Sequence, residues 1–352
     1  MSIVESEVLS AQAQSRSTPI RKRGITTYLH LGMPKTGSTL LQDHLFRNHP
    51  DIDFVGKYWR GRKYADQHFE AMTSHVFQPI KEMRRLDDEH KRAIQCRAVR
   101  ARDAGKVMLW SKEGTLSGSR HSDHARAARF REALGDCKVF FVIRHPLDWV
   151  ESEYWQSVKG LHLRPKVRRT WAPDSLRMPV MFSIDQWLEW NWQLKTTGLL
   201  SSLRYDETLR EYARVFGDEN VEIFMFEELK ESLTAFVRKL SSYLGIDAKA
   251  AIEVTAGQRA NDRWTTAQIK LLESIQRSAW RRWAFRRASH AKRMSMLGLD
   301  VVTDEPLKNN APKVRARLSA MWIERITQIT RERNRWLVEQ RGLPLAKYGY
   351  PL

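Results

Sequence analysis

The chain has 352 residues, 42% of them hydrophobic, so it is long enough to bury the core of one large domain. Its 60 Lys and Arg residues exceed its 41 Asp and Glu residues, and the net charge of +19 favours anionic partners such as phosphates, glycans, nucleic acid or an acidic membrane surface. No apolar run approaches the roughly 18 residues of a transmembrane helix, and we find no secretory signal. Two cysteines, Cys96 and Cys137, are too few for a disulfide framework, so we expect a reducing, cytoplasmic compartment.

Residues 1–23 are polar, lack periodicity and end in a basic triplet, which predicts a disordered basic arm. We expect residues 24–352 to form a single domain. Its first strand is predicted over 25–31 and is followed by a glycine-containing loop. A helix then begins near Ser38 and stops near Pro50, because proline cannot continue a helix.

Strands and helices alternate along the next two hundred residues. The further predicted strands are 106–110, 138–143 and 221–226, and the predicted helices lie within 60–104, 124–134, 147–158, 184–194, 206–216 and 233–244. Residues 160–180 are rich in Arg and Pro and indicate a loop, and residues 264–340 are mostly helical in pattern. The alternation predicts an α/β protein with a P-loop-like central parallel sheet flanked by helices and a helical C-terminal extension.

The glycine-containing loop, HLGMPKTGSTLLQ, differs from a nucleotide P-loop in the place of its lysine. A P-loop reads G-x-x-x-x-G-K-[ST]. Gly32 and Gly37 have that spacing and Ser38 and Thr39 follow, but the lysine lies inside the loop, at Lys35. A strand, a loop and a helix N-terminus still make a cradle for an anion, because backbone N–H groups and the helix dipole point into it.

The acidic metal ligand of a P-loop enzyme is also missing from its expected place. Kinases and ATPases place an Asp near the phosphates to hold Mg²⁺, whereas the apolar strand 138–143 ends at Arg144. A reaction without metal would need a protein cation at the bridging oxygen of the leaving group. Lys35 could fill that role.

At this point the sequence resembles the PAPS-dependent sulfotransferases. Their 5′-phosphosulfate loop is similar to Pro34, Lys35, Thr36, Gly37, Ser38, Thr39 and Leu40. Their 3′-phosphate motif, an Arg followed eight residues later by a Ser, is matched by Arg144 and Ser152, and Pro146 and Tyr154 also fit it. Similarity in a later strand-and-helix segment extends the resemblance over roughly residues 25–262, and the segment NRWLVEQRGLPLAKYGYP resembles the tail of many bacterial members.

The resemblance implies PAPS as donor, PAP as product and no metal. Lys35 would stabilise the leaving phosphate oxygen, and Ser38 and Thr39 with the loop amides would hold the 5′-phosphosulfate. Arg144 and Ser152 would hold the 3′-phosphate. The residues also support the 3′-phosphate role independently of the resemblance. Arg144 follows a buried strand at its C-terminal end, where ligands bind in open α/β sheets. Arginine can bind a phosphate with two parallel hydrogen bonds. The alternative is a structural arginine paired with a nearby carboxylate.

Sulfuryl transfer also needs a base for the acceptor hydroxyl or amine. Glu113 follows the strand 106–110 at its C-terminal end and faces the same crevice, and some branches of the resembled family place a Glu base there. Other branches place a catalytic Lys nearby, which makes Lys112 a second candidate, for stabilising the leaving group or the sulfuryl oxygens. The alternative is that Lys112 and Glu113 are ordinary charged residues of a loop. His30 is a rival base, although a structural role is the commoner one. His121 and His124 have no third ligand, so we predict no metal site.

The segment RSAWRRWAFRRASHAKRM, within residues 270–294, interleaves arginines with aromatic residues. It could bind an anionic glycan, lie on an acidic membrane, or bind nucleic acid by charge and stacking. We favour a helix with Trp280, Trp283 and Phe285 in the core and arginines in water, and we expect no nucleic-acid partner. A loop over 258–261 is a weak candidate for nucleotide contact.

The predicted function is therefore sulfuryl transfer from PAPS to a hydroxyl or amine acceptor, a carbohydrate or glycolipid. The enzymatic alternative is a kinase that uses ATP and Mg²⁺. The non-enzymatic alternative is a polyanion- or membrane-binding protein driven by the net charge. Acceptor pockets would come from the segments 57–100 and 160–182, whose sequence does not name the acceptor.

Overall fold

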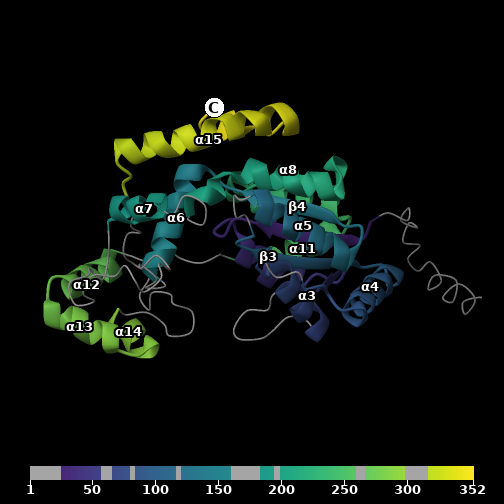
Figure 1. The fold of residues 1–352 in the computed structure, drawn as a ribbon, viewed down its shortest axis with the longest axis horizontal. Coiled ribbons are helices and arrows are strands. Elements are labelled where there is room, and N and C mark those ends of the chain that lie inside the picture. Colours follow the sequence, from purple (N-terminus) through teal and green to yellow (C-terminus); the bar gives the residue numbers. More distant parts are fainter. Residues whose placement is uncertain are drawn as a thin grey trace, which may run out of the picture.

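The computed structural model describes residues 25–56, 66–79, 84–115, 120–159, 183–193, 199–258, 266–297 and 316–352. Five parallel strands form one sheet in the order β2-β3-β1-β4-β5. The strands are β1 (Thr27–Gly32), β2 (Ile52–Phe54), β3 (Val107–Glu113), β4 (Lys138–Ile143) and β5 (Val221–Met225). The predicted α/β class with a central parallel sheet is confirmed (Figure 1).

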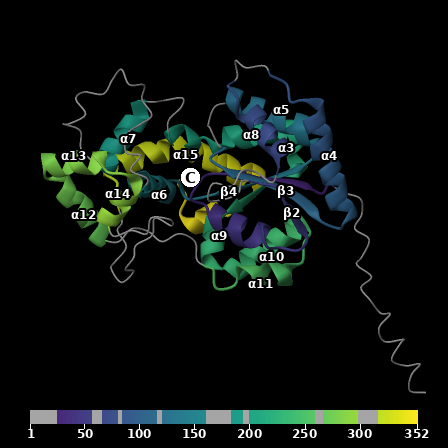
Figure 2. The ribbon, with the colours of Figure 1, turned by 90° about the horizontal axis from the view of Figure 1, so that it is seen from below.

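Helices pack on both faces of the sheet (Figures 1 and 2). They are α2 (Ser38–Leu40), which continues as the π-helix η1 (Leu41–Phe46), α3 (Gln67–Phe77), α4 (Asp88–Asp103), α5 (Arg120–Leu134), α6 (Pro146–Lys159), α7 (Ile184–Gln193), α8 (Tyr205–Phe216), α9 (Phe226–Glu231), α10 (Leu233–Leu244) and α11 (Ala248–Thr255). Short 3-10 helices cover Leu199–Leu203, Asp218–Asn220 and Leu345–Tyr348. The sequence missed β2, α9 and α11, which have three, six and eight residues and are too short to show a clear period.

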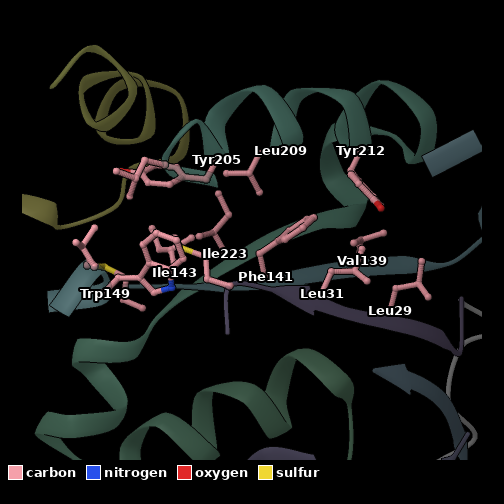
Figure 3. Close-up of a cluster of buried hydrophobic side chains, with 14 of the residues drawn as sticks. Leu29, Leu31, Val139, Phe141, Ile143, Trp149, Tyr205, Leu209, Tyr212 and Ile223 are labelled. Atoms are coloured by element: carbon pink, nitrogen blue, oxygen red, sulfur yellow. The ribbon is translucent and has the colours of Figure 1, made fainter. Parts of the chain in front are cut away.

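Alternate residues of the central strands face two separate cores, as the two-residue period of a strand requires. Phe141 and Ile143 of β4 belong to the core shared with α5 and α8, where Figure 3 shows them beneath Tyr205 and Tyr212 of α8. Phe140 of β4 points to the other face and packs with residues of η1 and α10. Every position of β1 is buried, because helices cover both sides of the sheet.

The C-terminal part is helical, as predicted. Three short helices, α12 (Thr266–Gln276), α13 (Ala279–Arg287) and α14 (His290–Met296), lie at one end of the molecule, and α15 (Ala320–Arg341) runs back over α6 and α8 (Figures 1 and 2). No helix in the described ranges is long and apolar enough to cross a bilayer.

The prediction that the aromatic residues of α13 are all core residues is wrong for its tryptophans. Phe285 is buried, but Trp280 is 69% exposed and Trp283 40% exposed. A nine-residue helix has room for few core positions on its inner side. Phe285 belongs to the same buried cluster as Ile269, Leu272, Ile275 and Leu297, whereas the two tryptophan rings contact each other on the exposed side of the helix.

Several sequence predictions fall on residues outside the described ranges. They concern the basic arm over 1–23, the Arg- and Pro-rich loop over 160–180 and the segment 259–261. Both cysteines are free thiols, Cys96 exposed and Cys137 buried. Burial raises the pKa of the Cys137 thiol above its usual value, so this sulfur is an unreactive core group.

Candidate active site

The C-terminal ends of β1, β3 and β4 lie in one row. Gly32, the last residue of β1, is opposite Glu113 of β3 on one side and Val142 of β4 on the other. The loop after β1, Glu113 and Arg144 therefore emerge at the same edge of the sheet. This is the edge at which open α/β sheets bind their ligands.

The loop after β1 is held by its carbonyl groups. Thr36 Oγ1 donates to the Met33 carbonyl at 2.8 Å, Trp149 Nε1 to the Pro34 carbonyl at 3.0 Å and Arg144 Nη1 to the Lys35 carbonyl at 2.9 Å. A trans peptide is planar, so the N–H of the next residue points opposite to each carbonyl. The N–H groups of Lys35 and Thr36 are thus turned away from α6 and from Arg144, the arrangement of an anion-binding loop.

Two residues of this loop have a left-handed backbone. Gly37 has φ 82°, and a Cβ there would meet Leu229 Cδ1 at 3.1 Å, so glycine suits the turn into α2. Lys35 has φ 64°, which is uncommon for a residue with a Cβ and is a local strain of the kind that gathers at functional sites. Its ammonium donates to Gln156 Oε1 at 2.8 Å, so the lysine at the crest of the loop is held by α6.

Ser38 and Glu113 are directly bonded. The Ser38 hydroxyl donates to Glu113 Oε2 with a short hydrogen bond. Thr39, the next hydroxyl of the motif, is partly exposed at the start of the same helix. An oxygen of a bound phosphate would compete with the Glu113 carboxylate for the Ser38 hydroxyl, so the predicted base lies at the border of the predicted donor site.

Arg144 joins the second motif to the first. Its side chain is only 4% exposed, its guanidinium lies 4.8 Å from the centre of the Phe226 ring, and it binds the Lys35 carbonyl. Ser152 is partly buried on α6, the helix that begins two residues after Arg144. The structure therefore brings the two motifs, more than a hundred residues apart in the chain, to one place.

Lys112 and the rival base His30 have different surroundings. The Lys112 ammonium lies 3.8 Å from the centre of the Phe77 ring, a cation–π contact. His30 is 2% exposed, stacks on Phe140 and bonds Ser111 Oγ through Nδ1 at 2.7 Å. Burial lowers its pKa to about 3, so His30 stays neutral near pH 7 and cannot take up an acceptor's proton there.

The sequence reasoning missed Glu153, which also lies at this site. Trp149, Glu153 and Gln156 recur at positions i, i+4 and i+7 of α6, so they share one helix face. Trp149 and Gln156 form hydrogen bonds with the loop after β1. Glu153 Oε1 is buried and has no hydrogen-bond partner in the described part of the chain. The helical spacing from Trp149 was the available signal in the sequence. That spacing identifies a helix face, but only the contacts with the loop show that the face lies at the site.

The site suits an anionic ligand with more than one phosphate. Two cations, Lys35 and Arg144, flank a loop whose amides are turned outward, and hydroxyls stand at the following helix. The residues present therefore have the charges and donors that suit a phosphate-bearing nucleotide such as PAPS. The described residues bring together no group of three His, Cys, Asp or Glu side chains that could hold a metal ion.

The chain is similar to known sulfotransferases. A family model described as a sulfotransferase domain matches residues 26–292. No curated protein matches the sequence. Similar solved structures include a sulfotransferase from Alicyclobacillus acidocaldarius (18% identity, 77% of this chain and 100% of that chain, TM-score 0.40) and mouse sulfotransferase SULT7A1 complexed with PAP (16%, 67% and 67%, TM-score 0.37). A third is the sulfotransferase domain from the curacin biosynthetic pathway (10%, 68% and 81%, TM-score 0.38). The family model covers both motifs of the site, and the chain belongs to the PAPS-dependent sulfotransferase family.

Proposed function

We propose that this sulfotransferase moves the sulfuryl group of PAPS in line onto a hydroxyl or amine of a carbohydrate or glycolipid, without a metal ion. PAPS supplies the activated sulfuryl group on a phosphate. The chain supplies binding, charge and a proton acceptor. The observation that carries the proposal is the contact of Arg144 with the loop that bears Lys35.

On the donor side, Lys35 stabilises the phosphate oxygen from which the sulfuryl group leaves. Loop amides with Ser38 and Thr39 hold the 5′-phosphosulfate, while Arg144 and Ser152 hold the 3′-phosphate. The hydrogen bond between Lys35 and Gln156 supports this assignment, because it keeps a cation at the loop before any ligand arrives.

On the acceptor side, Glu113 removes the proton of the attacking group. It is exposed at the edge of the sheet and one hydrogen bond away from Ser38, so an acceptor can reach it beside the donor loop. Lys112 is the candidate for charge stabilisation at the sulfuryl oxygens. The Lys112 ammonium must then leave its contact with the Phe77 ring when an acceptor binds.

A glycolipid acceptor would require the enzyme to approach a membrane surface. We propose that α13 makes this contact, with Trp280 and Trp283 entering the headgroup region. Exposed basic residues surround them: Arg277, Arg281, Arg287 and Lys292. Tryptophan between cations suits an acidic lipid surface, where the ring enters the interface and the charges meet anionic headgroups. The enzyme would work in the cytoplasm, where both of its thiols stay reduced.

The test is transfer of sulfate from PAPS to a panel of glycans and glycolipids, with EDTA present in every sulfate-transfer assay. A labelled product with the wild type and none with Lys35→Ala supports the proposal. Lys239→Ala is the matched control, since this exposed lysine pairs with Glu228 on the surface. Transfer of phosphate from ATP in the presence of Mg²⁺, with no transfer of sulfate, would contradict it and favour the kinase alternative.

A further inference from the structure

Glu153 is an unusual group to find on the wall of an anion-binding site. Its helix face is occupied on either side by Trp149 and Gln156, both bonded to the loop after β1. Its Oε1 atom is buried and has no hydrogen-bond partner among the described residues. A carboxylate with a buried oxygen that lacks a hydrogen-bond partner is disfavoured as an anion and favoured as a neutral acid.

Three charged groups act on Glu153, each from a different element. Lys35 on the loop and Arg144 after β4 attract its negative charge, and Glu113 at the end of β3 repels it. No charged side chain on α7 or α15, which pack on α6, is among the groups that act on it within the described ranges. Burial is the largest influence and raises the pKa of Glu153 to about 7.

The net charge of Glu153 and the three charged groups around it depends on whether Glu153 carries a proton. Two cations and two carboxylates sum to zero, whereas protonation of Glu153 leaves a net charge of +1. A bound phosphosulfate engages Lys35 and Arg144 and adds its own negative charge beside Glu153. Both changes disfavour the Glu153 carboxylate, since its attractive partners are taken and a like charge is added.

We propose that Glu153 is a donor-binding residue that acts as a neutral carboxylic acid: binding of the nucleotide is accompanied by uptake of one proton at Glu153, whose O–H then donates to an oxygen of the bound anion. The proton comes from solvent, and no covalent bond other than O–H is formed. This inference rests on the proposed function, because it takes PAPS and PAP as the ligands of the loop.

The inference also separates the two carboxylates of the site. A Glu153 that is protonated in the donor complex cannot accept the proton of the attacking hydroxyl. Glu113 is exposed to the acceptor side and remains available for that step. Two nearby carboxylates in different surroundings then take different roles, one as neutral donor and one as base.

The expected pH dependence follows from the two protonation states. Below about pH 7 the free protein already carries the proton on Glu153, and the affinity for PAP is highest. Above that value each binding event must take up the proton, so the affinity falls by about tenfold per pH unit until the pKa of the complex is reached. The phosphates of PAP titrate near pH 6 and strengthen binding as they ionise, so a comparison between variants is required.

The experiment measures PAP binding by isothermal titration calorimetry from about pH 6.5 to about pH 8.5 for wild type, Glu153→Gln and Glu151→Gln. Glutamine keeps the shape and a hydrogen-bond donor but cannot titrate. Glu151 lies on the same helix, with Oε1 accepting from Trp155 Nε1 and the Ala316 amide, and is the matched control.

We expect Glu153→Gln to bind PAP as tightly as wild type at the low end of the range and roughly tenfold more tightly at the high end. Glu151→Gln should follow the wild type throughout. Buffers of different ionisation enthalpy should report uptake of roughly half a proton per PAP near pH 7.5 in wild type and less in Glu153→Gln. Equal pH slopes in wild type and Glu153→Gln, or a uniform loss of affinity in Glu153→Gln, would overturn the inference. Absence of PAP binding by wild type at every pH would instead overturn the proposed function.

Discussion

At the scale of single residues, Arg144 has two tasks that a ligand series can separate. It binds the Lys35 carbonyl in the structure, and the proposal gives it the 3′-phosphate. Arg144→Ala should weaken adenosine 5′-phosphosulfate moderately, because the loop loses one of its supports. PAP should be weakened by about 2–3 kcal/mol more, since a charge-assisted contact to its 3′-phosphate is lost as well.

Titration calorimetry with both nucleotides measures that difference, and folding of the variant is checked by its melting temperature. Arg131→Ala is a suitable control. This arginine pairs with Asp136, which precedes β4, whereas Arg144 follows β4. Equal losses for the two nucleotides would show that Arg144 supports the loop and does not bind the 3′-phosphate.

Glu113 is tested by a change that keeps its hydrogen bond. Glutamine at this position can still accept from Ser38, so the start of α2 should be undisturbed. Loss of the proton acceptor should lower the rate of sulfate transfer by roughly 10²- to 10⁴-fold, with the affinity for PAP within about twofold of wild type. A Glu113→Gln enzyme that turns over at the wild-type rate would place the base elsewhere.

The sequence was informative about the groups that we propose as ligand-binding from a fixed motif, and uninformative about Glu153. Lys35 and Arg144 could be predicted because a loop of that spacing and a strand ending in arginine each have a physical meaning in the local sequence. Glu153 gains its meaning only from the burial of its oxygen and from two cations brought by distant segments. His30 was a rival base for which a structural role was favoured, and its burial and lowered pKa accord with that structural role.

At the scale of elements, most helices and strands of the sheet region followed from local pattern, whereas the short elements did not, and β3 continues to Glu113, beyond its predicted end at residue 110. The strand 138–143 was predicted with its observed limits because it is apolar after Lys138 and pairs with a neighbouring strand on each side, β1 and β5. β2, with three residues at the sheet edge, carries no such signal. The tryptophans of α13 were misplaced because aromatic residues at helical spacing usually mark a core, and exposure depends on how much core three short helices can form.

The α13 surface gives a prediction about that element. Replacing both Trp280 and Trp283 by alanine should weaken binding to vesicles with anionic lipid by at least about tenfold, since each ring loses its burial in the interface. Met321→Ala on α15, also exposed, should have no effect. Co-sedimentation with and without anionic lipid measures this, and added salt should lower the wild-type signal. Unchanged sedimentation of the double variant would remove α13 as the membrane contact.

At the scale of the whole molecule, the C-terminal segment packs next to the second motif, the one that contains Arg144. Tyr350 donates to Glu227 Oε2 at 2.8 Å, and Glu227 Oε1 accepts from the His145 amide at 2.9 Å, immediately after Arg144. Lys347 pairs with Glu231 on the same short helix, α9. A ligand that binds Arg144 therefore binds next to contacts made by Lys35 and by Tyr350, which are far apart in the sequence, and its binding should raise the stability of the protein.

The last prediction uses this coupling to separate the function from its alternatives. PAP should raise the melting temperature of the protein in the presence of EDTA, because Lys35 and the loop provide the charge that Mg²⁺ provides in a kinase. At a PAP concentration about 100 times the dissociation constant, the free energy of unfolding should rise by about 2.7 kcal/mol. ADP with Mg²⁺ should stabilise the protein less than PAP, and Lys35→Ala should lose most of the PAP effect. Stabilisation by ADP that requires Mg²⁺ and exceeds that by PAP would indicate a kinase. Stabilisation by heparin alone would indicate a polyanion-binding protein in which the net charge of +19 is the whole explanation.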